Sequence, residues 1–530
     1  MWISTVLNAA LCLAQIHSGN PAPPAETSNK TITVSGIVQD SVTGQPIRRA
    51  FVTLNEFAGG GQEQRQTASG EDGRFQFLAV RSGGGTIRAD RLGYSLRQID
   101  IQATLTSDWT DCVIKMDPLA AISGQVTDAH GEPLPGVAGQ AIRLTTVRGF
   151  RKMAVEAWNN TNDLGEFRLW HLRPGRYLLK ALGRRQVLFY MGERGLMQTR
   201  ESYGPVYYPD DDSAASANIV LLKPGEELAA HFSLKPHAAF RISGRILGAV
   251  HEQALNATLS RSGGEEVAAR TAINVENGSF SVDDVPPGDY TISMTEPVSQ
   301  SPKSAITEVH VRDRNVEGVT LELLSSPEVT FELDGTTGSG PRTQFASMEL
   351  HRADSKSPNP EQRLFFRPGT ASSKLTLAPG RYLVAINAFG GYVESVTSGE
   401  TDVLVSGLAV SSGVTPAPVK VKLGSGGGMI FFKSAGGDGP GNRDVPSAPA
   451  LIVGPVDGPW IPVEVERGGR QDGIGIQVAP GEYFVVRLTD PEAEYRDKSK
   501  IAGDIAKAKR IKVVEGQNVE VQLEAEEGKP

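Results

Sequence analysis

The sequence predicts an all-β protein, a tandem array of about five antiparallel β-sandwich domains with one short helix near the C-terminus. Three observations lead to this prediction. The chain has 530 residues, which is too long for one hydrophobic core. Its 59 glycines and 33 prolines punctuate short apolar runs, as in turn-rich β-proteins. Three short signatures also recur along the chain in one fixed order.

The N-terminal segment is expected to direct export. Residues 1–14 form an apolar stretch of signal-peptide length, too short to span a bilayer. A basic residue is missing in front of it and Asn8 interrupts it, so a frayed tail or a mis-assigned start is the alternative. Residues 15–29, rich in proline, are expected to be a spacer. We expect the protein in the periplasm, on the outer surface or in the medium, with Cys112 left without a disulfide partner after cleavage.

The first signature, Ser-Gly-x-aliphatic, begins a strand that leads into a polar turn containing Gly and Asp. It occurs at Ser35–Val38, Ser123–Val126 and Ser243–Ile246. The second signature, Gly-x-Phe, is followed by apolar residues two apart, which predicts a strand with one buried face. It occurs at Gly73–Phe75, Gly165–Phe167 and Gly278–Phe280.

The third signature, Pro-Gly-x-Tyr, predicts a type II turn in which Gly takes a positive φ and Tyr starts the returning strand. It occurs at Pro174–Tyr177, Pro287–Tyr290, Pro379–Tyr382 and Pro480–Tyr483. Each module is then expected to end in a hairpin-like pair of strands. The pairs are 511–514 with 519–523, 219–222 with 232–234, and 403–405 with 419–423.

These signatures predict five sandwiches with boundaries near the following residues: 30–118, 119–237 with an aromatic insertion, 238–325, 326–424 and 425–527. The fourth and fifth lack the Ser-Gly opening. The expected helix begins with Asp490 as N-cap and Pro491 at its first position, runs to about Lys507, and lies on the last sandwich.

The ordered set of signatures resembles the carboxypeptidase regulatory-like domain, a transthyretin-like sandwich also classed with the carbohydrate-binding-like fold. The second and third modules match best. The segments Tyr207–Pro209 with Asn218–Leu221, and Gly399–Leu408, are similar to tandem arrays of this domain in bacterial exported proteins. The resemblance implies an Ig-like β-sandwich fold and an extracytoplasmic setting. It implies no activity, because the same fold serves many functions.

Catalytic and metal-binding motifs are missing from the sequence. A zinc peptidase needs His-x-x-Glu with a distant His, or His-Glu-x-x-His, and neither spacing occurs. The histidines are expected to be ordinary surface or strand-edge residues: His17, His130, His171, His231, His237, His251, His310 and His351. Cys112 is expected to be a buried, inert thiol, and Asp210–Asp212 a solvated acidic turn. The sequence therefore predicts no catalytic residue, no metal site and no cofactor.

An insertion between Leu182 and Asn218 holds the strongest candidate binding surface. Aromatic side chains on a loop can stack on sugar rings or anchor a protein partner. The candidate residues are Phe189, Tyr190, Tyr203, Tyr207 and Tyr208. The alternative, which we favour, is that they cover the edge of the sandwich or pack on the neighbouring module.

The sequence thus favours a non-catalytic envelope protein, structural or adhesive, with a glycan or an envelope protein as its candidate partner. An accessory subunit or non-catalytic relative of a secreted peptidase is the alternative. A transporter-related protein is disfavoured because no long series of amphipathic strands follows the modules.

The net charge of the chain is −8, and the sequence contains no basic block that could neutralise phosphates. We therefore expect no nucleic-acid partner. No run beyond the N-terminus is apolar enough for a transmembrane helix. The sequence leaves the oligomeric state open.

Overall fold

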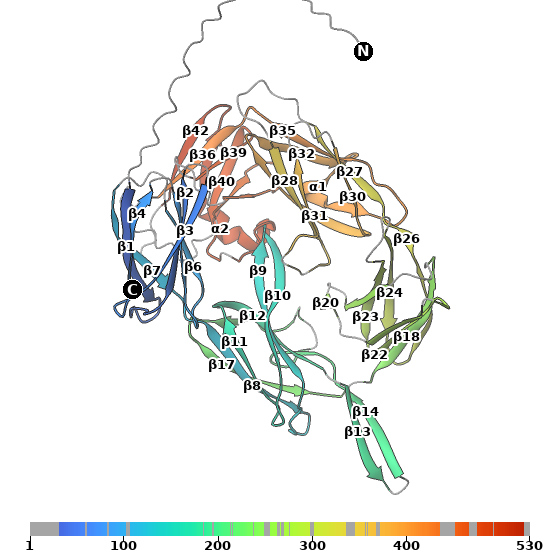
Figure 1. The fold of residues 1–530 in the computed structure, drawn as a ribbon. Coiled ribbons are helices and arrows are strands. Elements are labelled where there is room, and N and C mark those ends of the chain that lie inside the picture. Colours follow the sequence, from blue (N-terminus) through green and yellow to red (C-terminus); the bar gives the residue numbers. More distant parts are fainter. Residues whose placement is uncertain are drawn as a thin grey trace, which may run out of the picture.

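The protein is built almost entirely of short β-strands in small sheets (Figure 1). The structure, a computed structural model, describes residues 31–523 with internal gaps. The gaps are 59–60, 82–83, 102–106, 184, 193–194, 212–213, 215, 237, 249–254, 262–264, 267–269, 275, 297–301, 335–344, 356, 358, 367–371, 435–450, 466–473 and 491. The expected signal peptide and spacer, residues 1–14 and 15–29, lie outside this range. None of the helices described has the length and apolar character to cross a membrane.

The first three sandwiches each pair a smaller and a larger sheet. The first contains β4 (Arg74–Arg81), β1 (Thr31–Asp40) and β7 (Trp109–Met116) against β3 (Gly61–Ala68), β2 (Phe51–Ala58), β5 (Gly85–Asp90) and β6 (Arg97–Ile101). The second contains β11 (Glu166–Leu172), β8 (Ala120–Asp128) and β17 (Glu227–Leu234) against β10 (Phe150–Asn160), β9 (Ala138–Val147), β12 (Gly175–Leu182), β15 (Val206–Tyr207) and β16 (Val220–Leu222). The third contains β21 (Arg270–Asn274), β22 (Ser279–Val285), β18 (Phe240–Leu247) and β25 (Val316–Glu322) against β20 (Glu265–Glu266), β19 (Asn256–Arg261), β23 (Gly288–Thr295), β24 (Lys303–Val311) and β26 (Leu324–Ser325).

The last two sandwiches have the same plan and carry the helices. The fourth contains β30 (Ser372–Thr376), β27 (Glu328–Asp334), β35 (Val419–Gly424), β32 (Tyr392–Ser398) and β33 (Thr401–Asp402) against β29 (Gln362–Phe366), β28 (Phe345–Arg352), β31 (Gly380–Phe389) and β34 (Leu408–Val410), with α1 (Val403–Ser406). The fifth contains β39 (Ile474–Val478), β36 (Gly428–Ser434) and β42 (Asn518–Leu523) against β38 (Val463–Glu464), β37 (Leu451–Pro455), β40 (Gly481–Arg487) and β41 (Lys509–Val513), with the 3-10 helix η1 (Lys498–Ile501) and α2 (Ala502–Ala506). The all-β prediction is confirmed.

Each sandwich has a hydrophobic core drawn from its own strands. The five main clusters of buried residues lie within 32–116, 120–234, 242–323, 329–423 and 430–521. Alternation along β1, where every second residue is buried, shows how one face supplies the core. Because each core closes on itself, what joins the sandwiches lies at their surfaces.

The first strand of each sandwich pairs in parallel with its last long strand, here called the closing strand, which the sequence did not predict. β7, β17, β25, β35 and β42 lie parallel to β1, β8, β18, β27 and β36 respectively. The closing strand therefore belongs to the sheet of the first strand, while the strand before it joins the other sheet. The expected hairpin-like endings are wrong on this point: β16 pairs with β12, and β41 pairs with β40, across the core from their supposed partners.

The close parallel pairing explains the Ser-Gly signature. A Cβ atom built on Gly36, Gly124 or Gly244 would overlap a backbone carbonyl oxygen of the closing strand. These oxygens belong to Cys112, Ala230 and Val319. Only glycine permits such an approach of two backbones.

The Pro-Gly-x-Tyr segments differ from the expected type II turn. In all four segments Gly is the first residue of a strand. Gly175 and Gly380 have φ values of 153° and 151°, and neither Gly288 nor Gly481 is among the positive-φ glycines. Tyrosine instead makes the reversal specific, because each hydroxyl donates to the carbonyl four residues upstream at 2.7–2.9 Å. This is the arrangement of a tyrosine corner.

Two local predictions are corrected. The helix near the C-terminus begins at Lys498 with Asp497 as its N-cap, and Asp490 instead accepts the backbone N–H of Glu492 in a turn. Residues 403–405, expected as a strand, belong to α1 because the Asp402 side chain caps Leu404 N.

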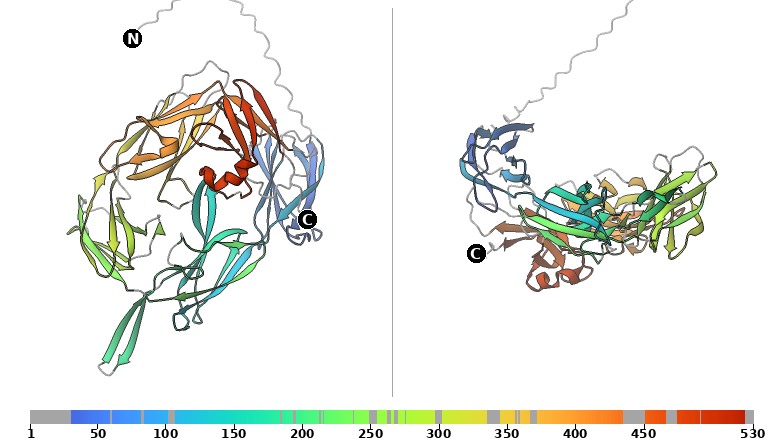
Figure 2. Two further views of the ribbon diagram at one scale, coloured as in Figure 1. Left: turned by 180° about the vertical axis from the view of Figure 1, so that it is seen from behind. Right: turned by 90° about the horizontal axis from the view of Figure 1, so that it is seen from below.

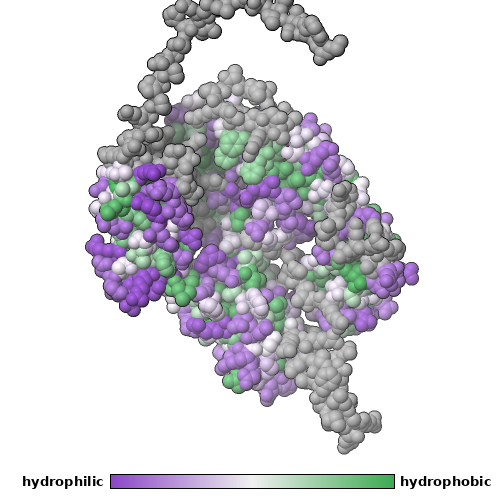
Figure 3. Space-filling model, in the orientation of Figure 1, coloured by the Kyte–Doolittle hydropathy of each residue, from purple (hydrophilic) through white to green (hydrophobic). Residues whose placement is uncertain are grey.

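The second to fifth sandwiches follow one another around a closed path (Figure 1). The hairpin β9–β10 extends from the second sandwich towards α2 of the fifth (Figures 1 and 2). The first sandwich stands out of the plane of the others when the molecule is seen from below (Figure 2). The β13 (Arg185–Gly192) and β14 (Gly195–Ser202) hairpin projects away from the ring. On the face in Figure 3, hydrophilic residues cover most of the coloured part of the first sandwich.

Candidate functional site: a clasp between three sandwiches

The hairpin β9–β10 reaches beyond the sheet that contains it. β9 pairs with β10 over its full length, from Ala138 to Val147, but with β12 only from Ala138 to Arg143. Residues 144–153 therefore form a two-stranded arm. Its turn, Arg148–Gly149, has φ values of 52° and 78°, the pair of positive values that a two-residue type I′ hairpin requires.

The tip of the arm inserts between the fourth and fifth sandwiches. The Arg496 guanidinium lies 4.4 Å from the centroid of the Phe150 ring, and the His351 ring lies 5.8 Å from it. Arg496 Nε also donates to the Arg148 carbonyl at 2.7 Å. A Cβ atom on Gly149 would meet Tyr495 and Arg496 atoms at 2.7 Å, so glycine is needed here for contact as well as for φ.

Basic side chains of the arm face acidic groups of the other two sandwiches. Arg148 lies 3.7 Å from Glu349, within β28, and 3.9 Å from Glu464, the last residue of β38. Arg151 pairs with Glu494 at 2.7 Å. These partly exposed pairs are screened by solvent, so each contributes less than 1 kcal/mol or so, and their main effect is to fix the register of the contact.

Lys152 is the most buried cation of the arm. Its side chain is 2% exposed, and Nζ donates to the Ser355 carbonyl at 3.1 Å in the loop that follows β28. A buried ammonium group is costly unless it is hydrogen-bonded. The fourth sandwich therefore provides a specific acceptor for the arm.

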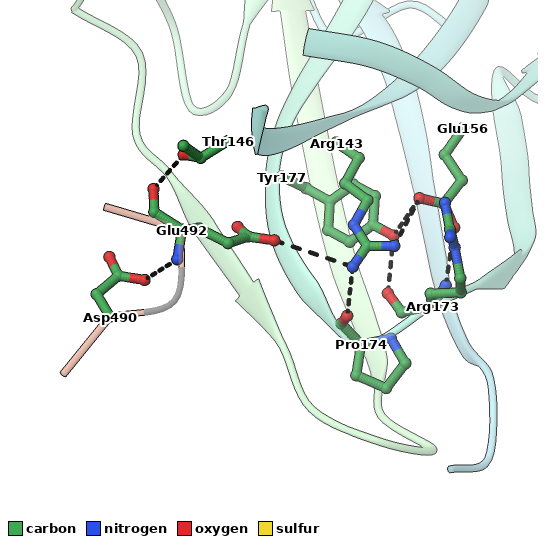
Figure 4. Close-up of polar contacts among 8 residues, drawn as sticks. All are labelled: Arg143, Thr146, Glu156, Arg173, Pro174, Tyr177, Asp490 and Glu492. Carbon is green, nitrogen blue, oxygen red and sulfur yellow. Dashed lines mark hydrogen bonds and ion pairs between the residues drawn. The ribbon is translucent and has the colours of Figure 1, made fainter. Parts of the chain in front are cut away.

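The base of the arm is braced by Glu156, which occupies a β-bulge and faces Arg173 and Tyr177 (Figure 4). The register of β9 and β10 shifts between Val155 and Ala157, leaving Glu156 as the extra residue. Glu156 Oε1 accepts from Arg173 Nε at 2.9 Å, and Oε2 lies 2.9 Å from the Tyr177 hydroxyl. Burial alone would raise the pKa of Glu156, but the hydrogen bonds and charge of Arg173, with a smaller contribution from the nearby Tyr177 hydroxyl, hold that pKa below its usual value.

The segment after β40 docks on this base. Arg143 Nη2 donates to the Pro174 carbonyl at 3.5 Å and lies 4.0 Å from Glu492 Oε1 (Figure 4). Thr146 Oγ1 donates to the Glu492 carbonyl, and Arg176 pairs with Asp490. Burial raises the pKa of Glu492, because Arg143 compensates the loss of solvent only in part.

Tyr495 and Trp460 hold the docking segment in place within the fifth sandwich. The Tyr495 hydroxyl donates to Glu464 Oε2 at 3.0 Å, and Trp460 Nε1 donates to the Tyr495 carbonyl at 2.8 Å. Burial lowers the pKa of the adjacent Arg496, yet an arginine remains charged at any physiological pH. We call the whole contact among residues 143–156, 349–355, 464 and 490–497 the clasp.

The residues of the predicted aromatic surface lie in two separate places, at the second sandwich and on the projecting hairpin. Tyr203 and Tyr207 are buried, and Tyr208 is partly buried against the core of the second sandwich. Tyr207 also stacks under Lys180 Nζ at 5.1 Å. These positions agree with the alternative in which the tyrosines cover the sandwich edge. Phe189 and Tyr190 lie on β13 of the projecting hairpin, and their side chains are outside the described residues.

The histidine expectation holds for four residues and fails for one. His130, His171, His231 and His310 are exposed, whereas His351 is completely buried in the clasp. His17, His237 and His251 lie outside the described residues. Within the described parts of the chain, no group of three or more His, Cys, Asp or Glu side chains is placed to hold a metal ion.

The other predicted features are placed as follows. Cys112 is buried in β7, as expected. Asp210 is exposed and pairs with Lys235 at 3.4 Å, Asp211 bonds to the Tyr207 backbone, and Asp212 lies outside the described residues. A shallow depression beside β21 and β22 is lined by uncharged residues only: Ala272, Ile273, Asn274, Ser279, Phe280 and Ser281.

Sequence reasoning missed the clasp. Two signals for its parts were present: an Arg-Gly dipeptide between alternating runs, which is a hairpin pattern, and the acidic segment from Asp490 to Asp497. Neither signal says that the two segments meet. Their contacts span more than 300 residues of sequence.

Comparison with known proteins supports the family resemblance for part of the chain. Residues 33–114, which cover nearly all of the first sandwich, match the family model of the carboxypeptidase regulatory-like domain. The motifs had instead favoured the second and third sandwiches. No curated protein matches the chain.

Among solved structures, the chain is similar to the minor pilin GBS52 of Streptococcus agalactiae, with 13% identity over 39% of this chain and 97% of the pilin, at a TM-score of 0.23. The shaft pilin SpaA of Lactobacillus rhamnosus GG has 11% identity over 39% of this chain and 98% of its own, at a TM-score of 0.21. The Bacillus anthracis TIE protein has 13% identity over 71% and 69%, at a TM-score of 0.16. At such TM-scores no functional conclusion follows from these likenesses.

Proposed function

We propose that this chain is a non-catalytic, exported envelope protein whose sandwiches form a closed structural frame, with adhesive contacts to a protein or a glycan. The clasp is the observation that carries the proposal. A simple spacer needs contacts only between successive modules, whereas here the arm of the second sandwich contacts both the fourth and the fifth. Closing so long a loop costs conformational entropy, so the clasp must supply specific interactions.

The chemistry of the clasp suits a frame better than a reactive site. Arg151 and Glu494 pair across the contact, and the Phe150 ring lies 4.4 Å from the Arg496 guanidinium and 5.8 Å from the His351 ring. Such contacts fix orientation and register. A closed frame would present its loops and its projecting hairpin at fixed positions.

The frame is tested by small-angle X-ray scattering on the full chain. The double variant Arg148→Ala with Phe150→Ala should increase the radius of gyration, because the arm loses its aromatic anchor and the ion pairs of Arg148. Trp170→Ala, which removes an exposed aromatic from β11 of the same sandwich, is the matched control and should leave it unchanged. A double variant as compact as the wild type would refute the frame.

We further propose that the five sandwiches are separate domains with the boundaries 30–118, 119–237, 238–325, 326–424 and 425–527, and that residues 1–14 are removed on export. The separate buried cores support the division. Limited proteolysis should cut first near these boundaries. N-terminal sequencing of exported protein should begin at residue 15, and an intact Met1 would refute the signal peptide.

Adhesion is proposed at the projecting hairpin. Tyr203 and Tyr207 are buried and Tyr208 is partly buried against the core of the second sandwich, so the proposal rests on the other two candidate residues, Phe189 and Tyr190. Replacing both with Ala should reduce retention on envelope polysaccharide or in an envelope-protein pull-down, while the fold is preserved. Unchanged retention on both would reject this surface.

An accessory subunit of a secreted peptidase is the second candidate, since the family description at residues 33–114 refers to carboxypeptidases. Co-purification with a peptidase, lost on deletion of the first sandwich, would favour it.

A further inference from the structure

His351 is an unusual residue at the centre of the clasp. It lies near the end of β28, its side chain is completely buried, and neither ring nitrogen has a hydrogen-bond partner among the described residues. The nearest carboxylate oxygen, Glu349 Oε2, is 3.5 Å from Nε2, which is too long for a strong hydrogen bond. A neutral imidazole can be held in such a place, but an imidazolium leaves two N–H donors without acceptors.

The charges that face His351 come from all three sandwiches. From its own strand, Glu349 attracts a proton, although this carboxylate is already engaged by Arg363 at 2.8 Å and by Arg148 at 3.7 Å. From the arm, Lys152 repels a proton on the ring and Phe150 covers the ring. From the fifth sandwich, Arg496 repels it as well. Burial and the two cations outweigh the carboxylate.

We propose that His351 makes the clasp sensitive to pH, so that protonation of its ring in mild acid releases the arm and opens the frame. The inference rests on the closed frame proposed above. Mild acid is the range in which histidine, alone among side chains with ordinary pKa values, changes its charge. Release of the arm would let solvent and counter-ions reach the charged ring.

The direction of the pH effect follows from the difference in proton affinity between the closed and the open state. Burial, followed by the charge of Lys152, lowers the pKa of His351 in the closed state below the usual 6.5. Opening therefore takes up a proton. The closed state is therefore most stable above the ordinary pKa of histidine. As the pH falls, the closed-to-open equilibrium constant decreases by up to about tenfold for each unit by which the pKa of the closed state lies below that of the open state.

Glu492 acts in the opposite sense. Burial raises its pKa in the closed state above the usual 4.5, so its protonation favours closure as the pH falls. The two effects are separated by the variant Glu492→Gln, which removes the second titration and should leave a larger opening in acid than the wild type shows.

The test is intramolecular energy transfer on the full-length protein. Exposed residues Asp163, in the second sandwich, and Asp457, in the fifth, are changed to Cys and labelled, with Cys12 replaced by Ala and Cys112 protected by burial. Transfer should be high at pH 8 and should fall between pH 7 and pH 5. Low transfer already at pH 8 would contradict the frame itself, whereas high transfer at every pH would overturn only the role of His351.

Matched variants assign the response. His351→Phe keeps a ring against Phe150 without a titratable group, and it should stay closed from pH 8 to pH 5. His310→Gln alters an exposed histidine that pairs with Asp289 at 2.7 Å, and it should follow the wild-type profile. If His351→Phe opens in acid as the wild type does, the inference is wrong.

A measurement on the unaltered chain covers the case in which His351→Phe does not fold. Histidine side chains labelled with 13C are titrated by NMR, and the His351 signal should titrate below the ordinary pKa of 6.5. A pKa at or above the ordinary 6.5 for His351 would overturn the inference.

Discussion

Tyrosine hydroxyls occupy the same place in four successive sandwiches. Each donates to the backbone carbonyl four residues upstream, as in Tyr290 to Pro286 and Tyr382 to Ala378, both at 2.8 Å. Burial raises the pKa of Tyr382 to about 12, so the hydroxyl remains a donor throughout the physiological range. This hydrogen bond gives a physical reason for Tyr, and not Phe, in the repeated Pro-Gly-x-Tyr signature.

Removing the hydroxyl should destabilise one sandwich at a time. Tyr290→Phe and Tyr382→Phe should each lower the free energy of unfolding by about 1 kcal/mol, the net contribution of one hydrogen bond plus a stranded carbonyl. Hydrogen exchange resolved by segment would measure it. Tyr392→Phe, at a tyrosine for which no hydroxyl hydrogen bond is described, should have little effect. Equal losses in all three variants would contradict the assignment.

Gly149 has two roles that can be separated. Gly149→Ala introduces a Cβ at a positive φ of 78° and against Tyr495 and Arg496. Gly131→Ala, with φ of 86° and open space around the Cβ, has the conformational cost alone, about 1 kcal/mol. We expect both to destabilise the second sandwich, but only Gly149→Ala to enlarge the protein in X-ray scattering. Enlargement by both would show that backbone strain, and not contact, is responsible.

At the scale of elements, a single bulge turns a sheet strand into an arm. The extra residue Glu156 points its carboxylate to Arg173 and Tyr177 and so ties β10 to the turn before β12. Beyond this point β9 and β10 continue without a third strand. A two-stranded hairpin is marginally stable alone in water, so the arm depends on its base and on the clasp.

The bulge predicts a pH dependence with a definite sign. Because the pKa of Glu156 is lowered by Arg173 and Tyr177 despite burial, its contribution is complete above the ordinary pKa of about 4.5 and is lost as the pH falls through the lower folded value. Glu156→Gln should therefore cost about 1 kcal/mol near pH 7, where screening of the exposed Arg173 limits the loss. Segment-resolved hydrogen exchange at several pH values would measure it. A variant whose deficit stays the same down to pH 3 would contradict this account.

At the scale of the whole molecule, the clasp converts a chain of sandwiches into a closed path. The arm belongs to the second sandwich and its acceptors to the fourth and fifth, so the two sides lie on separable pieces of chain. The basic side chains of the arm differ in exposure, from Lys152 at 2% to the half-exposed Arg151. Association should therefore weaken with salt without being abolished by it.

Two fragments should reassemble through the clasp. Residues 30–237 and 326–527, produced separately, should bind each other weakly, because association that is intramolecular in the full chain becomes intermolecular. Arg151→Glu in one fragment should weaken binding, and Glu494→Arg in the other should restore part of it. Calorimetry would measure the cycle. Failure of two folded fragments to bind at high concentration would contradict the clasp.

The sequence by itself determined the class of fold and the local plan of each sandwich. The features that it revealed make their contacts within one sandwich of about 100 residues: the glycines at strand crossings, the alternating apolar residues and the repeated tyrosine. They follow from local sterics and from the need for a buried face. The 33–114 match agrees with that plan. Sequence alternation cannot tell which loop residues turn inward, as Tyr203 and Tyr207 do.

Only the tertiary structure decided which sheet each strand joins and how the sandwiches meet. The closing strand crosses the core to pair in parallel with the first, a choice that depends on packing across the whole sandwich. The clasp joins Phe150, His351 and Arg496, which are far apart in sequence. Their contact depends on the cumulative orientation of four sandwiches, because each local pattern fixes its own core and leaves the relation between cores undetermined.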